Sequence, residues 1–202
     1  AWNHSAEMSR CREKRPALPF SAPQRFNGFY DMSGRIFRIR GLVQGVGFRP
    51  YVWRLANELG LTGWVRNDGA GVIVAVNGKN WPKFKSRLPL EAPRLARIDA
   101  IEDEAAGVTG DGFAILDSAA GEIKTAIGPD AAICPACIAD MLDPANRRWR
   151  YAFTTCTHCG PRYTVSRRIP YDRAQTSLAA FPLCALCDAE YLAPADRRFH
   201  AE

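Results

Sequence analysis

Six cysteines in the second half of the chain constrain its fold more than any other feature, because their spacing ties distant segments together. Cys134-Pro-Ala-Cys137 is followed, after eighteen residues, by Cys156-Thr-His-Cys159. This C-x2-C-x18-C-x2-C spacing is typical of four thiolates around one tetrahedral zinc ion. The chain has seven cysteines and no visible export signal, so we expect a cytoplasmic protein whose thiols stay reduced and bind Zn²⁺ rather than form disulfides.

The cysteine region also contains an internal repeat. Shifting the chain by fifty residues superposes "CPACIADMLDPANRRWR" at 134–150 on "CALCDAEYLAPADRRFH" at 184–200. We therefore predict zinc-finger repeats over 134–202, with Cys184 and Cys187 as ligands of a second zinc site. The matching cysteine pair would fall at positions 206 and 209, so we expect the second repeat to be truncated. His200 aligns with Arg150 and is not assigned as a ligand.

The pairing of the cysteines stays open at this stage. The third pair could begin its own site, or it could complete a site with the first or the second pair. Either arrangement closes one four-cysteine site and leaves one pair of thiols over.

The charge of the chain does not indicate a nucleic-acid binder. The net charge of +6 is spread evenly: five basic against three acidic residues in 1–34, thirteen against eleven in 35–133, and nine against seven in 134–202. Proteins that bind a phosphate backbone usually concentrate their basic residues on one stripe. The sequence also lacks an apolar run of about 18 residues, so no membrane segment is expected.

The first half of the chain shows the pattern of a small α+β domain. Residues 1–34 contain several prolines and no sustained period, so we expect an irregular N-terminal extension. Alternating and helical patterns then follow each other in the order βαββαβ, with one more strand at the end. The expected strands are 35–44, 61–67, 71–77, 95–104 and 112–118, and the expected helices are 50–59 and 80–88.

That order indicates a ferredoxin-like sandwich over residues 35–117, with two helices on one face of an antiparallel sheet. Residues 118–133 are small and polar and are interpreted as a linker to the zinc-binding Cys-knuckle module. We expect this linker to separate two independent cores.

A glycine-rich turn between the first strand and the first helix suggests an anion site. The turn reads Gly45-Val46-Gly47-Phe48-Arg49, and its bare backbone would let an anion approach the N–H groups at the helix start. Arg49 could add a bidentate contact to phosphate oxygens. The alternative is that the glycines only make a tight turn.

The string "VQGVGFR" at 43–49, followed by "GWVRN" at 63–67, resembles the acylphosphatase family. The resemblance implies that Arg49 binds the substrate phosphate, within a loop formed by residues 45–49, and that Asn67 positions the attacking water. From the residues alone, Asn67 could instead cap the turn at Asp68 and Gly69.

Together with "CTHCGPRYTV" and the two repeats, residues 35–202 resemble the N-terminal part of the HypF carbamoyltransferases of [NiFe]-hydrogenase maturation. The resemblance implies hydrolysis of carbamoyl phosphate here, with missing C-terminal domains that use ATP and a HypE-type acceptor protein. Two alternatives remain: a zinc-ribbon module that binds protein or nucleic acid and has a vestigial acylphosphatase fold, and a stand-alone acylphosphatase of broad specificity.

Overall fold

A computed structural model of the chain describes residues 34–119, 130–160, 163–168 and 173–201. Almost all of the N-terminal extension expected at 1–34, and residues 120–129 of the expected linker, lie outside the described residues. Gly34 is the exception, since it begins the first strand.

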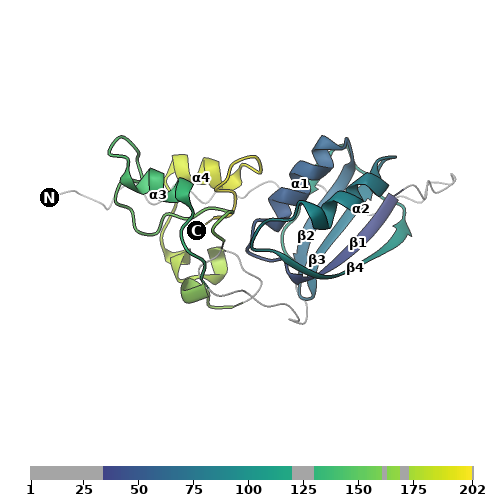
Figure 1. Cartoon of the computed structure of the whole chain (residues 1–202), viewed down its shortest axis with the longest axis horizontal. Helices are drawn as coiled ribbons and strands as arrows, with labels where there is room; N and C mark the ends of the chain where they lie inside the picture. The colour runs from purple at the N-terminus through teal and green to yellow at the C-terminus, as the bar shows by residue number, and fades with distance from the viewer. Residues whose placement is uncertain (1–33, 120–129, 161–162, 169–172, 202) are drawn as a thin grey trace, which may run out of the picture. The chain divides into compact units, whose positions relative to one another are not determined.

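A five-stranded sheet forms the first half of the described chain (Figure 1). The strands follow the order β4-β1-β3-β2-β5 across the sheet. Neighbouring strands are antiparallel except for β2 and β5, which are parallel. The strands are β1 (Gly34–Leu42), β2 (Thr62–Asp68), β3 (Gly71–Asn77), β4 (Arg97–Ala106) and β5 (Phe113–Ile115).

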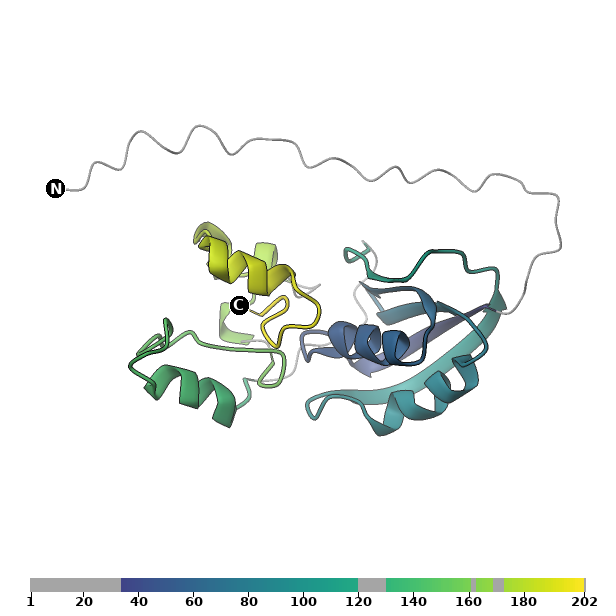
Figure 2. The same ribbon diagram turned by 90° about the horizontal axis from the view of Figure 1, so that it is seen from above.

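Two helices, α1 (Phe48–Glu58) and α2 (Trp81–Leu90), lie side by side on one face of the sheet (Figures 1 and 2). Phe37 of β1 is fully buried beneath them, and its ring centroid lies 5.6 Å from that of Phe84 in α2. Tyr51 of α1 donates a hydrogen bond to the backbone oxygen of Leu88, 2.9 Å away, and so joins the two helices. The predicted ferredoxin-like α+β fold is confirmed.

Both helix boundaries differ from the prediction for local reasons. Helix α1 begins at Phe48 rather than Pro50, because Gly47 takes the left-handed N-cap conformation at φ 74°. Helix α2 continues through Pro89 to Leu90 instead of ending before it. A proline in the last turn removes a single helical N–H donor, so the helix loses little there.

The cysteine region contains two short helices that obey the fifty-residue repeat. Helix α3 (Pro135–Leu142) begins directly after Cys134, and α4 (Ala185–Leu192) begins directly after Cys184. Among the described residues between them lie three short 3₁₀ turns, at Tyr163–Val165, Arg173–Gln175 and Ser177–Ala180.

Arginines of each repeat form ion pairs with an acidic residue of the other repeat. Arg147 and Arg148 of the first repeat form ion pairs with Glu190 of α4. Arg197 and Arg198 of the second repeat form ion pairs with Asp140 of α3. Asp140 and Glu190 are equivalent positions fifty residues apart, so each repeat supplies two arginines to the acid of the other, and Glu190 is also 3.9 Å from Arg198 of its own repeat.

Candidate functional site

The glycine turn and Arg49 stand at the N-terminus of helix α1 and line a small pocket of about 40 Å³. Gly45 and Gly47 both have left-handed backbone angles, at φ 70° and 74°. The first N–H groups of a helix have no acceptor within it and carry the positive end of its dipole. Arg49 is only 9% exposed, so its charge acts in a partly dehydrated site. The pocket is therefore suited to a compact anion.

Asn67, at the end of β2, lines the same pocket. The structure thus brings together the two residues that the sequence places eighteen positions apart. Asn67 is almost fully buried, and its Oδ1 atom has no hydrogen-bond partner among the described residues. The turn that follows is capped by Asp68, whose Oδ1 accepts from the N–H groups of Ala70 and Gly71. Capping by Asn67 is therefore not the role of this side chain.

Gln44 is a part of the site that sequence reasoning missed. Its Nε2 atom donates to the backbone oxygens of Asp68 and Gly71, at 2.6 and 2.8 Å. This buried side chain fixes the β2–β3 turn to the glycine loop, and so sets the position of Asn67 relative to Arg49. The only sequence signal was its place within "VQGVGFR", because the contact itself is long-range.

The finger region forms the other wall of the pocket. Its lining includes Thr157, which lies within the second cysteine knuckle, and His200 of the second repeat. A Cβ atom on Gly47 would lie 2.9 Å from both the Cβ and the backbone oxygen of Thr157. The two regions keep separate clusters of buried side chains, but they contact each other at this pocket. The linker also starts later than expected, since Ala119 still donates to the backbone oxygen of Asn67.

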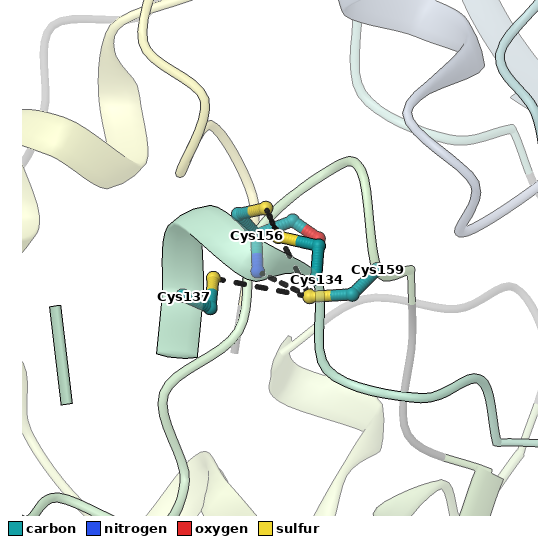
Figure 3. A group of neighbouring side chains, drawn as sticks. All are labelled: Cys134, Cys137, Cys156 and Cys159. Carbon is teal, nitrogen blue, oxygen red and sulfur yellow. Dashed lines mark hydrogen bonds between the residues drawn. The ribbon is translucent and has the colours of Figure 1, made fainter. Parts of the chain in front are cut away.

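Four cysteine side chains gather at the start of α3 and in the loop that follows it (Figure 3). The Sγ–Sγ distances are 3.6 Å for Cys134–Cys156, 3.8 Å for Cys156–Cys159 and 3.9 Å for Cys137–Cys159. Four sulfurs at about 2.3 Å from a tetrahedral zinc ion would be about 3.8 Å apart. The residues therefore fit zinc, and the first two cysteine pairs close one site together. This is the arrangement in which the third pair begins a site of its own.

The electrostatics of these thiols favour a bound cation. The hydrogen bond between Cys156 and Cys159 lowers the pKa of the Cys159 thiol and raises the pKa of the Cys156 thiol. Burial raises the pKa of Cys137. A divalent cation allows all four sulfurs to ionise together. With four protein ligands a bound zinc ion would have a structural role and would stabilise the fold of this region.

Cys184 and Cys187 lie apart from this cluster. Within the described ranges they belong to no group of three or more metal-ligating side chains. Arg147 Nη1 lies 3.9 Å from the sulfur of Cys184 and 3.1 Å from that of Cys187. Its repeat equivalent, Arg197, contacts Cys137 of the closed site at 3.2 Å. The environment of Cys184 and Cys187 thus resembles that of a zinc-ligating pair, and zinc binding by these two residues stays a prediction.

In the comparison with known proteins, each of the two parts of the chain matches a family model. The acylphosphatase family model matches residues 35–115, and the HypF finger model matches residues 133–166. An acylphosphatase of Caldivirga maquilingensis is 42% identical over 69 residues, which are 33% of this chain and 73% of that protein. The chain belongs to the acylphosphatase family.

Within that family, the chain is similar to the HypF carbamoyltransferases. The carbamoyltransferase HypF2 of Cupriavidus necator is 58% identical over 153 residues, which are 73% of this chain and 19% of that protein. A crystal structure of full-length HypF in the phosphate- and nucleotide-bound form has a TM-score of 0.74 at 39% identity, and covers 83% of this chain and 23% of that one. The chain spans about a fifth of the length of these HypF relatives, in their N-terminal region.

None of the helices in the described part of the chain is long and apolar enough to cross a membrane.

Proposed function

We propose that this acylphosphatase domain hydrolyses carbamoyl phosphate to carbamate and inorganic phosphate. The observation that carries the proposal is the shared pocket of the glycine loop, Arg49 and Asn67. Hydrolysis of an acyl phosphate requires these elements: backbone N–H groups that hold the phosphoryl group, a fixed positive charge, and a polar group that orients the attacking water.

The reaction needs little covalent chemistry from the protein. A water molecule attacks phosphorus, the bond from phosphorus to the bridging oxygen breaks, and the carbamate leaves with the bonding electrons. The N–H groups at the start of α1 and the Arg49 guanidinium hold the charged phosphoryl oxygens. The buried Oδ1 of Asn67 accepts a hydrogen bond from the attacking water and orients it. The closed zinc site contributes stability rather than a reacting group.

The relatives support this assignment. The full-length HypF whose structure this chain matches was solved with phosphate bound, and phosphate is the product proposed here. We infer that carbamate passes on to ATP-using domains of a longer protein and then to a HypE-type acceptor. The cytoplasmic location expected from the sequence stays a prediction.

The test is phosphate release from carbamoyl phosphate, acetyl phosphate and an unrelated phosphomonoester. We expect turnover of carbamoyl phosphate and no turnover of the monoester, whose leaving group is poor. Equal turnover of the two acyl phosphates would support a stand-alone acylphosphatase of broad specificity. A chain that binds inorganic phosphate but cleaves neither acyl phosphate would refute the proposed hydrolysis.

A further inference from the structure

A histidine of the second finger repeat contacts the arginine of the glycine loop. The Nδ1 atom of His200 lies 3.2 Å from Nη2 of Arg49, and the contact is partly buried. A guanidinium carries N–H donors and no acceptor, so Arg49 donates and Nδ1 accepts. The imidazole is therefore unprotonated at Nδ1, and its neutral form carries the proton on Nε2.

The His200 ring is held from two directions. It stacks on the Tyr191 ring, with centroids 4.8 Å apart and an interplanar angle of 8°. It also stacks on the ring of Phe199, at 4.2 Å and 23°. Its backbone N–H donates to the Tyr191 oxygen at 3.1 Å. A side chain fixed in this way presents its acceptor to Arg49 in one orientation.

The repeat explains the backbone at this position but not the histidine. The equivalent residue, Arg150, has the same left-handed backbone, at φ 59° against 52° for His200. Its N–H donates to the Met141 oxygen, as that of His200 does to the Tyr191 oxygen. The Arg150 guanidinium, however, lies over the ring of Trp149. The acceptor that faces Arg49 is thus particular to the second repeat.

The surrounding finger holds this residue against the glycine loop. Thr157, which packs on Gly47, donates through its N–H and its hydroxyl to the backbone oxygen of Arg197, at 2.8 and 3.1 Å. The knuckle that contributes two zinc ligands is therefore tied directly to the segment that carries His200.

We propose that His200 is a positioning residue of the acyl phosphate site, which orients the Arg49 guanidinium for a bidentate contact with the phosphoryl group. This inference rests on the function proposed above. A bidentate contact requires the guanidinium plane to be fixed, and an acceptor on one Nη atom restricts rotation of that plane. His200 acts through Arg49 and takes no part in bond breaking.

Two substitutions separate the acceptor from the ring. His200→Phe keeps an aromatic ring to stack on Tyr191 and removes the acceptor. His200→Asn removes the ring and keeps an acceptor at the place of Nδ1, and asparagine tolerates the left-handed backbone. We expect the phenylalanine variant to bind inorganic phosphate about 10- to 100-fold more weakly, as for loss of a hydrogen bond to a charged group. The asparagine variant should retain most of the affinity.

The measurement is titration of the full chain with inorganic phosphate, followed by kcat and KM for carbamoyl phosphate. Zinc content and the unfolding midpoint show whether each variant is folded. If His200→Phe does not fold, His200→Leu replaces it, because leucine matches asparagine in size and has no acceptor. Arg150→Asn is the control for a change at the equivalent left-handed position, and it should leave phosphate affinity unchanged.

The possible results are distinct. Phosphate affinity that falls in the variants without an acceptor and recovers with asparagine supports the role of His200, even if no acyl phosphate is hydrolysed. Turnover by the unaltered chain, together with equal phosphate affinity in all folded His200 variants, overturns the role of His200 and leaves the proposed function standing. A chain that binds no inorganic phosphate refutes both.

Discussion

Replacing Gly47 by alanine tests whether the finger wall and the glycine loop form one site. Gly47 has φ 74°, and an alanine in the left-handed region costs about 1–2 kcal/mol. The new Cβ would also lie 2.9 Å from the backbone oxygen of Thr157, a contact that real side chains avoid. Overpacking of this kind costs about 1–3 kcal/mol more. The total destabilisation should therefore be about 2–5 kcal/mol.

Gly60 offers a matched control, because it has φ 64° and no atom within 4 Å of the position a Cβ would take. Gly60→Ala should show the backbone strain alone, about 1–2 kcal/mol. Urea unfolding of both variants and of the unaltered chain measures the difference, and titration with inorganic phosphate measures the site. Only Gly47→Ala should weaken phosphate binding. Equal unfolding midpoints and equal phosphate affinities in the two variants would show that Thr157 does not press on the loop.

Three further outcomes are expected. Arg49→Ala should lower turnover at least about 10²-fold, and Arg49→Lys should also fail because lysine cannot make the bidentate contact; near-native kinetics in either would remove Arg49 from the site. Asn67→Ala should reduce kcat about 10²-fold with little change in phosphate affinity, whereas a parallel loss of affinity would make Asn67 a phosphate ligand. Chelation of zinc should weaken phosphate binding, because Thr157 lies between two zinc ligands. After dialysis, metal analysis should find one tightly held zinc ion per chain. Alkylation should modify Cys184 and Cys187 first, and protection of these two thiols would show that they hold a second zinc ion.

The sequence was sufficient for the elements that local pattern determines. Alternation of apolar residues located β1, because one face of that strand is buried. The apolar run at Val72, Val74 and Val76 located β3, which is buried on both faces. Gly47 and Pro89 explain the two helix boundaries that differed, since each depends on a backbone detail within one turn. The spacing of the first four cysteines predicted the zinc cluster, because ligand number and geometry restrict which side chains can meet.

The remaining features of the site depend on contacts that no local pattern encodes. Gln44 reaches a turn more than twenty residues away. His200 reaches Arg49 across 151 positions, from a repeat that the sequence read as a separate module. In the sequence repeat His200 aligns with Arg150, and this alignment gives no indication of a contact with Arg49. Such contacts arise from the packing of one part of the chain on another, so their residues became visible only in three dimensions.

The ion pairs between the repeats form later during synthesis than the first zinc site can. Ribosomes add about 5–20 residues per second, so Arg197 follows Cys159 by about 2–8 s, over thirty-eight residues. All four sulfurs of the first site are therefore made before the arginines that pair with Asp140 exist. Zinc can hold the first repeat together during that interval, whereas its ion pairs can form only after α4 and the segment behind it have left the ribosome. The nascent chain thus depends on the supply of metal earlier than it depends on its second repeat.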